Sequence, residues 1–363
     1  MLPIVLTAEE KIHLYKLAID ARVKIERFNA LLERSIINQE VLMSFSLQEA
    51  IQSTRIEGTQ TTFNKVLESN ITGEQGTAER EVSNYLEALA VGKERLRHLP
   101  ISTRLFLELH SILLNDSRGG NRPPGEYRKI QNFIGPTSDI KDATYISPEP
   151  QLINKYMSNL EEYINGEIVN DLDPLIRAGI IHGQFETIHP FLDGNGRMGR
   201  LLITLLLCEQ KALSKPLLYI SHYFKLNRLE YYDRLMNIRT KGDWEGWLKF
   251  FLKGVILVAN QAVSTSRKIV NLQSTHRQLV SERIISAHSY NLLEYLFQRP
   301  IINTKKAAQA LGISFATASR LITLFCENSI LEEMTGKNRN RVYVYKSYLD
   351  ILNADFLTDE EEY

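Results

Sequence analysis

Apolar residues recur at intervals of three and four positions over most of the first half of this chain of 363 residues. That interval places them on one face of a helix with about 3.6 residues per turn, and so predicts amphipathic helices. The segments that share the pattern are 8–34, 38–57, 80–97, 102–115, 150–165 and 174–188. We therefore expect a mainly α-helical fold, long enough to form two or three domains with cores of their own.

One segment between these helices breaks the helical pattern. The run Pro123-Pro124-Gly125 ends the preceding helix, and residues 126–134 read as extended. The pair Gly135-Pro136 marks a turn, and extended character resumes at 140–146. The segment predicts a β-hairpin, with an irregular surface excursion between two helices as the alternative.

The strongest chemical signal is the stretch His-Pro-Phe-Leu-Asp-Gly-Asn-Gly-Arg-Met-Gly-Arg at residues 189–200. Its glycines, Gly194, Gly196 and Gly199, let backbone N–H groups approach a ligand closely. The apolar run 201–207 that follows reads as a buried helix. The glycines then lie at a helix N-terminus, where unpaired N–H groups and the helix dipole favour phosphate.

The side chains of this stretch fit the same interpretation. Arg197 and Arg200 are three residues apart, so they share a helical face and can both reach phosphate oxygens. Asp193 adds a negative charge, which suits the site if Mg²⁺ bridges it to the phosphates. His189, with an ordinary pKa of about 6.5, is suited to act as a general base at neutral pH.

The stretch resembles the signature of the Fic family, H-P-F-x-[D/E]-G-N-G-R-x-x-R, at every specified position. Enzymes of this family typically transfer AMP from ATP to a hydroxyl side chain of a target protein. The resemblance implies that His189 deprotonates the hydroxyl, that Phe191 anchors the loop and that Asp193 holds Mg²⁺. It assigns the remaining motif positions to nucleotide binding: Gly194, Asn195 and Gly196 as an anion nest for the α- and β-phosphates, Arg197 on the phosphates, Gly199 beside them, and Arg200 on the γ-phosphate.

The same resemblance implies the reaction and its alternatives. The intact Gly-Asn-Gly core favours AMP transfer over kinase-like phosphoryl transfer. The donor base is not encoded in the phosphate motif, so UTP, a phosphocholine nucleotide, or the reverse reaction that removes AMP are the enzymatic alternatives. Fic proteins also carry a flap where the hairpin is expected here, at 126–146. On that reading Ile134 and Gly135 approach the nucleotide, and the flap edge binds an extended target segment by strand addition.

A second motif lies at the end of the expected helix 38–58. Ser53 and Glu57 are four residues apart and share a face, and Gly58 suits a C-cap. A glutamate in the last helical turn meets the negative end of the dipole, so either an arginine holds it or it is a solvated surface side chain. The run resembles the Fic inhibitory motif [S/T]-x-x-x-E-[G/N]. That resemblance implies that Glu57 pairs with Arg200 in cis and blocks the γ-phosphate.

Other candidate residues have structural alternatives. His182, Glu186 and His189 could share one helical face as metal ligands do, but no fourth ligand is evident, so we interpret His182 as a packed helix residue. His110 lies in the apolar segment 102–115, and we interpret it as a structural residue too. Tyr231 and Tyr232 resemble the part of Fic proteins that lines the adenine and ribose pocket, where aromatic rings stack on a purine; buried core aromatics are the alternative.

The sequence changes character after about residue 265. A polar stretch up to residue 283 predicts a linker or a long connecting helix. Beyond it, a helix at 289–298, a helix-turn-helix over 304–328 and two strands near 331–345 resemble a winged helix. The modest basic edge of this unit consists of Arg320, Lys337, Arg339 and Arg341. Glu327, Glu332 and Glu333 lie nearby, so docking of a protein or dimerisation is favoured over DNA binding.

Composition limits the location and partners of the chain. Lys plus Arg and Asp plus Glu are 43 each, so the chain has no net charge that would attract nucleic acid or a membrane electrostatically. Two cysteines, Cys208 and Cys326, read as core thiols in a reducing compartment. The longest apolar run is far shorter than the ~20 residues of a membrane span, and the N-terminus lacks a signal-peptide pattern. We expect a cytoplasmic protein without membrane contact.

These patterns lead to one overall hypothesis. The expected regions are an N-terminal helical region at 1–100, a Fic catalytic core at 101–265 and a winged-helix domain at 284–350. The expected function is Mg²⁺-dependent transfer of AMP from ATP to a Ser, Thr or Tyr hydroxyl of a target protein, including auto-modification. A homodimer is compatible with this hypothesis. The alternative from another class is a nucleotide-sensing transcriptional regulator that binds DNA.

Overall fold

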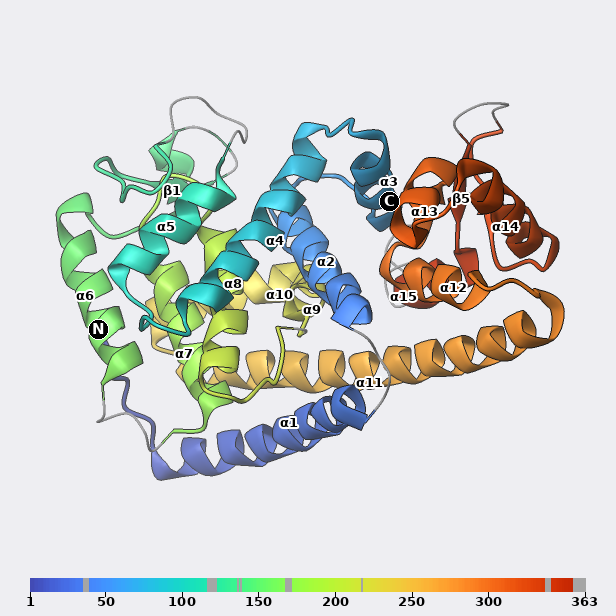
Figure 1. Cartoon of the computed structure of the whole chain (residues 1–363). Coiled ribbons are helices and arrows are strands. Elements are labelled where there is room, and N and C mark those ends of the chain that lie inside the picture. Colours follow the sequence, from blue (N-terminus) through green and yellow to red (C-terminus); the bar gives the residue numbers. More distant parts are fainter. Residues whose placement is uncertain are drawn as a thin grey trace. The chain divides into compact units, whose positions relative to one another are not determined.

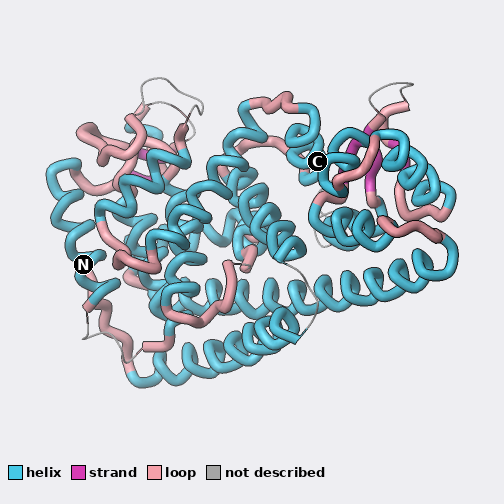
Figure 2. The backbone as a smooth tube through the Cα atoms, viewed as in Figure 1, coloured by secondary structure: helices cyan, strands magenta, loops and turns pink. Residues whose placement is uncertain are grey.

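The computed structural model describes residues 1–34, 39–115, 123–135, 137, 139–166, 172–216, 218–336 and 341–354. Within these ranges the chain forms fifteen α-helices and two small antiparallel sheets, so the predicted mainly α-helical fold is confirmed. Helices dominate the backbone drawn in Figure 2. The chain divides into two compact units. The first comprises Met1–Asn29, Ser46–Thr61 and Thr77–Asn260, and the second comprises Ala30–Phe45, Thr62–Gly76 and Gln261–Tyr363.

The helices of the first unit, labelled in Figure 1, flank both motifs. Their bounds are α1 Ala8–Arg34, α2 Gln39–Ile56, α4 Thr77–Arg95, α5 Thr103–Leu113, α6 Ile153–Asn165, α7 Pro174–Ile188, α8 Asn195–Glu209, α9 Ile220–Leu226, α10 Arg228–Lys241 and the start of α11 Trp244–Arg283. The segment 265–283 belongs to α11. Of the two alternatives for this stretch, the long helix is therefore correct and the irregular linker is wrong.

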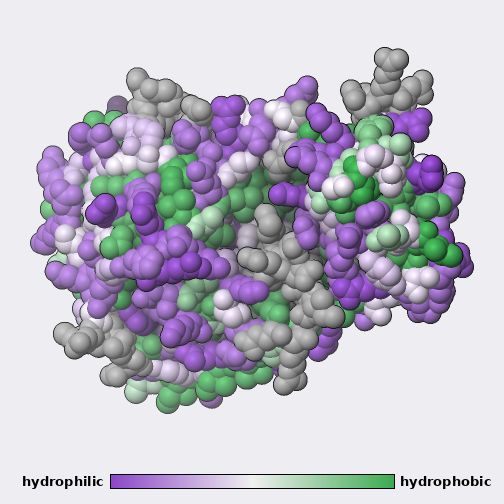
Figure 3. Space-filling model, in the orientation of Figure 1, coloured by the Kyte–Doolittle hydropathy of each residue, from purple (hydrophilic) through white to green (hydrophobic). Residues whose placement is uncertain are grey.

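The centre of this unit is the pair α7 and α8. Both helices are buried around nearly their whole circumference, including most of their polar side chains. Asp173 caps α7 by accepting a hydrogen bond from the N–H of Leu175, with Pro174 at the first helical position. Helix α4 packs closely on α8, because a Cβ at Gly92 would lie only 2.8 Å from Leu205 Cδ1. The surface shown in Figure 3 is largely hydrophilic by contrast.

The predicted hairpin is present, but its strands are shorter than the sequence indicates. Strand β1 Phe133–Ile134 pairs antiparallel with β2 Tyr145–Ile146, and the 3-10 helix η1 Ile140–Asp142 lies in the connection. Residues 126–132, expected to be extended, form no ladder. Side-chain hydrogen bonds described below hold them instead. Pro136 lies outside the described residues, and the 3-10 helix η2 Pro150–Leu152 leads into α6.

The second unit contains the expected helix-turn-helix. Its elements are α3 Phe63–Thr72, α12 Ser289–Gln298, β3 Ile301–Asn303, α13 Thr304–Leu311, α14 Phe315–Glu327, β4 Glu332–Glu333, β5 Val342–Val344 and α15 Lys346–Asn353. The strands form an antiparallel sheet in the order β3-β5-β4. Gly312 between α13 and α14 has φ +64, which favours glycine. Strand β3 was not predicted from the sequence, and Lys337 and Arg339 lie outside the described residues.

No single helix in the described part of the chain is long and apolar enough to cross a membrane. Helices α13 and α14 together meet that criterion by length and composition only, but they are bent by 111° at their turn. Cys208 and Cys326 are free thiols of intermediate exposure.

Candidate active site

The loop between α7 and α8 is held in shape by its own side chains. Helix α7 ends at His189, whose backbone is left-handed at φ 51 and ψ 59 and whose N–H donates to Phe185 O. Helix α8 begins after Gly194, which is also left-handed at φ 75. The amide of Asn195 closes the loop: Phe191 N donates to Oδ1 and Nδ2 donates to Phe191 O, both at 2.8 Å. These two hydrogen bonds of Asn195 therefore shape the anion nest from behind.

His110 of α5 holds the same loop from the other side. Its Nδ1 accepts from Gly125 N at 2.9 Å, so its Nε2 carries the proton that is donated to Asp193 O at 2.9 Å. Its ring stacks on the fully buried ring of Phe191, with centroids 3.6 Å apart. Burial lowers the pKa of His110 to about 4, so the ring stays neutral. The sequence interpretation of His110 as structural overlooked this positioning of the loop, which no local pattern reveals.

Glu57 and Arg200 meet at the first turns of α8. Arg200 Nη2 donates to Glu57 Oε1 at 2.7 Å and to Ser53 O at 2.9 Å, and its Nε donates to Ser53 Oγ at 2.9 Å. The Arg200 side chain is 1% exposed, whereas that of Glu57 is 35% exposed. Burial alone would lower the pKa of Arg200, but the Glu57 carboxylate raises it above its ordinary value. Gly58 follows at φ 88, as a C-cap glycine does.

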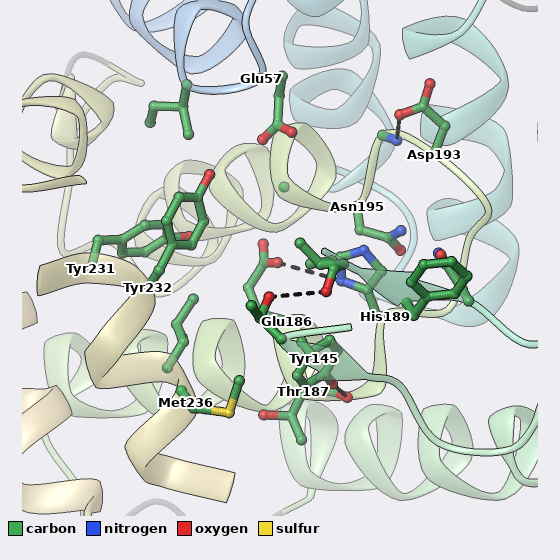
Figure 4. A pocket seen from close by; sticks show the side chains of 18 of the residues that line it. Glu57, Tyr145, Glu186, Thr187, His189, Asp193, Asn195, Tyr231, Tyr232 and Met236 are labelled. Atoms are coloured by element: carbon green, nitrogen blue, oxygen red, sulfur yellow. Dashed lines mark hydrogen bonds and ion pairs between the residues drawn. The ribbon is translucent and has the colours of Figure 1, made fainter. Parts of the chain in front are cut away.

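These residues border a cavity of about 480 Å³. The expected site residues that line it are Glu57, Ile134, His189, Asp193, Gly194, Asn195, Gly196, Arg200, Tyr231 and Tyr232. In Figure 4, Tyr232 and Met236 lie on the wall opposite His189 and Asp193, and Glu57 projects between the two walls. The structure thus brings together two motifs more than a hundred residues apart in the chain.

Three expected nucleotide contacts do not line this cavity. Arg197 is 4% exposed and lies with Nη1 3.6 Å from Glu81 Oε2. A Cβ at Gly199 would lie 2.4 Å from Glu186 Oε1, so Gly199 faces α7. A Cβ at Gly135 would lie 2.9 Å from Asp142 O, so Gly135 faces its own hairpin. Close packing, not ligand contact, explains both glycines.

The charge state of His189 follows from its burial. Burial lowers the pKa of the imidazole to about 4, so it is neutral and able to accept a proton at neutral pH. Its Nδ1 faces α7, where it lies 3.9 Å from Glu186 Oε2. Burial raises the pKa of Glu186 to about 7. Tyr145 of the hairpin completes the surroundings, with its ring edge-on to the imidazole at 6.1 Å.

The two tyrosines of α10 differ in role. Tyr231 is 1% exposed, and its hydroxyl is 2.9 Å from His182 Nε2, so it serves mainly as a core aromatic. Tyr232 is 40% exposed and lies beneath the Arg228 guanidinium at 5.6 Å, so its ring is accessible for stacking. His182 is fully buried and hydrogen-bonded, as its structural interpretation implies.

The side chains around the cavity that could coordinate a metal suit a cation held partly by the phosphates of a bound substrate. In the part of the chain that the structure describes, no group of three or more His, Cys, Asp or Glu side chains could hold a metal ion. Asp193 brings one carboxylate, 29% exposed, to the cavity wall. Mg²⁺ commonly binds one or two carboxylates together with substrate phosphates, so this residue fits such an ion.

Comparison with known proteins identifies relatives of both parts of the site. The model of the Fic/DOC family matches residues 100–207, and the model of the Fic/DOC family N-terminal region matches residues 15–94. Together they match more than half of the chain.

Curated relatives of this chain carry the name protein adenylyltransferase. The chain is 31% identical over 169 residues to protein adenylyltransferase Fic of Drosophila grimshawi, covering 46% of this chain and 30% of that protein. It is 28% identical over 169 residues to protein adenylyltransferase fic-1 of Caenorhabditis briggsae, covering 47% and 29%. The chain thus matches less than a third of the length of these relatives.

Solved structures share the fold. A Fic family protein from Desulfovibrio desulfuricans G20 aligns with a TM-score of 0.61 at 21% identity, covering 95% of this chain and 98% of that one. A Fic-domain-containing signaling protein from Bacteroides thetaiotaomicron aligns with a TM-score of 0.56 at 19% identity, covering 68% and 97%.

Proposed function

Because the chain belongs to the Fic/DOC family, we propose that it is a protein adenylyltransferase that Glu57 inhibits in cis. In this function it transfers AMP from ATP to a hydroxyl side chain of a target protein. The observation that carries the proposal is the cavity in which His189, the N-terminus of α8 and Arg200 meet. It combines a neutral base with an anion-binding helix end and a buried cation, which are the groups that nucleotidyl transfer needs.

The chemistry follows from the positions of these groups. His189 Nε2 takes the proton of the target hydroxyl, and the hydroxyl oxygen attacks the α-phosphorus of ATP. The bond from that phosphorus to the oxygen bridging the α- and β-phosphates breaks, and pyrophosphate leaves. The N–H groups at the start of α8 stabilise the negative charge on the phosphates. Mg²⁺ bound through Asp193 would neutralise phosphate charge. Tyr232 and the apolar side chains of the cavity wall would hold the adenine.

The inhibition follows from competition for one guanidinium. Arg200 directs its described hydrogen bonds to Ser53 and Glu57. A γ-phosphate that binds Arg200 would meet the Glu57 carboxylate, and two negative groups cannot share that cation without repulsion. Glu57 therefore excludes the productive phosphate position. The edge of the β1–β2 hairpin, which borders the cavity at Ile134 and Tyr145, would present the target segment.

Intact-mass spectrometry tests the proposal directly. Wild type, Glu57→Gly and the double variant Glu57→Gly/His189→Ala are incubated with ATP, GTP, UTP or CDP-choline, each with Mg²⁺ or with EDTA. We expect Glu57→Gly to gain the mass of AMP from ATP and Mg²⁺, the wild type to gain far less, and the double variant none. A phosphocholine or UMP increment would identify a different donor. No increment in Glu57→Gly with any donor would overturn transfer.

A further inference from the structure

Arg128 is a buried cation in the segment that leads into the hairpin. It is 3% exposed, and in the described part of the chain no carboxylate forms an ion pair with it. A buried charge without an ionic partner is unfavourable unless its donors are all satisfied by hydrogen bonds. The role of this cation is therefore to be sought in the groups that its N–H donors bind.

The donors of Arg128 converge on main-chain oxygens of three segments. Nε donates to His189 O at 2.9 Å, Nη1 to Ile130 O at 3.1 Å and Nη2 to Pro148 O at 2.5 Å. The backbone N–H of Arg128 also donates to Pro190 O at 2.9 Å. Ile130 precedes β1 and Pro148 follows β2, so one guanidinium joins both ends of the hairpin to the residue that carries the imidazole.

The backbone conformation of His189 requires stabilising contacts of this kind. Its left-handed φ of 51 is unfavourable for a residue with a side chain, and a following proline further disfavours helical backbone angles. Such a conformation persists only where surrounding contacts over-determine it. The contacts are the N–H bond to Phe185 O on one side and the Arg128 bond to the carbonyl on the other.

Other side chains link the same two segments. Asn132 Nδ2 donates to Phe191 O at 3.1 Å, and the Tyr145 hydroxyl donates to Thr187 O. The hairpin is thus attached to the chain on both sides of His189. Arg128 alone among these residues bonds to His189 itself and to both hairpin ends.

We propose that Arg128 is a positioning residue that couples the β1–β2 hairpin to the orientation of His189. It fixes the orientation of the imidazole relative to the strand edge that presents the target hydroxyl. Because that hydroxyl belongs to the proposed reaction, the inference rests on the proposed function. A guanidinium is required because its planar fork sends donors in three directions, whereas a lysine ammonium is a single point that cannot span the three carbonyls.

The test uses the Glu57→Gly background, in which labelling is measurable. Arg128→Lys keeps the charge and loses the fork, Arg128→Gln removes the buried charge and keeps one amide donor, and Lys129→Gln is the control. Lys129 is the adjacent cation, exposed and paired with Glu126 at 2.9 Å. For each variant, kcat and KM for ATP are measured, together with the affinity and stoichiometry of ATP binding by calorimetry.

We expect both Arg128 variants to lose at least about tenfold in kcat, because small misplacements of reacting groups are costly. KM, affinity and stoichiometry should stay near the Glu57→Gly values, whereas a simple loss of folded protein would lower the stoichiometry. In a further variant, Arg128→Ala in the same background, added guanidinium ion should partly restore kcat. Unchanged kcat in Arg128→Lys or Arg128→Gln would overturn the inference.

A second measurement separates this inference from the proposed function. If Glu57→Gly itself fails to label, the proposed function is wrong, and the role of Arg128 is read from hydrogen exchange. Removal of the fork should accelerate exchange of the Ser147 N–H, which donates to Asn132 O across the hairpin. Exchange as slow as in the wild type would contradict the coupling whatever the enzyme transfers.

Discussion

Glu57 Oε1 and Arg200 Nη2 lie 2.7 Å apart, and they join the end of α2 to the first turns of α8. The contact is asymmetric, because the arginine is buried and the glutamate remains partly exposed. A Cβ at Gly196 would lie 2.2 Å from Glu57 Oε1, so the carboxylate also rests against the anion nest. Glu57 thus meets both the cation and the helix end that a polyphosphate would use.

Substitution of Glu57 by glutamine should separate charge from shape. Glu57→Gln retains a side-chain oxygen for Arg200 but removes the negative charge, so we expect a labelling rate between those of the wild type and Glu57→Gly. Initial rates with radiolabelled ATP measure this, with the exposed Glu209→Gln as control. A rate equal to that of Glu57→Gly would mean that charge alone accounts for the inhibition.

The two motif arginines should respond differently to truncation. Arg200→Ala removes the cation of the cavity and should weaken ATP binding measured in the Glu57→Gly background. Arg197→Ala should leave ATP affinity nearly unchanged but lower stability by about 3 kcal/mol, because it strips a buried cation from Glu81. Calorimetry and urea unfolding distinguish the two. If Arg197→Ala weakened ATP binding without loss of stability, the result would support the phosphate contact that the motif resemblance implies for Arg197.

A methyl group at position 199 should strain the α7–α8 contact. Since the added Cβ would lie 2.4 Å from Glu186 Oε1, Gly199→Ala should cost about 1–3 kcal/mol, as overpacking does. Shortening the partner should recover part of the loss, so Gly199→Ala/Glu186→Ala is expected to be more stable than the sum of the single changes. Urea denaturation of the four proteins gives the coupling energy. Strict additivity would argue against this contact.

The pH dependence of transfer should reflect the low pKa of His189. Burial lowers that pKa to about 4, so the basic form predominates above pH 4 and is lost as the pH falls through that value. For Glu57→Gly, kcat/KM should therefore be flat through neutral pH and decline only on the acidic side, since this ratio reports the free enzyme. An acidic limb centred near the ordinary histidine value of about 6.5 would show that His189 is solvated in the active enzyme.

The helix-turn-helix of the second unit should bind DNA poorly. Arg320 is the sole cation of α14, so few phosphate contacts are available from the helix that would enter a groove, and affinity scales with such contacts. We expect no retardation of duplex DNA by the full chain at about 0.15 M salt, near physiological ionic strength. Salt-dependent retardation that Arg320→Ala abolishes would favour the regulator alternative instead.

Several elements follow from local sequence alone. The helical spacing over 174–188 and the cap Asp173-Pro174 predict α7 because they act within one or two turns. The position of β1 could not be predicted to the residue. Its two residues pair with β2, while Arg128 and Asn132 hold the preceding segment through bonds to the α7–α8 loop. Those bonds join residues about sixty positions apart, which no local pattern encodes.

The sequence by itself determined the helical fold, the glycine-rich loop before α8 and the inventory of base, carboxylate and cations. Only the tertiary structure decided where each of these groups points. The spacing of Arg197 and Arg200 predicts a shared face, but α8 is buried on all sides, so helical periodicity cannot distinguish cavity from core. Neighbouring elements make that distinction: Glu81 of α4 lies near Arg197, Glu186 of α7 approaches Gly199, and Glu57 after α2 pairs with Arg200.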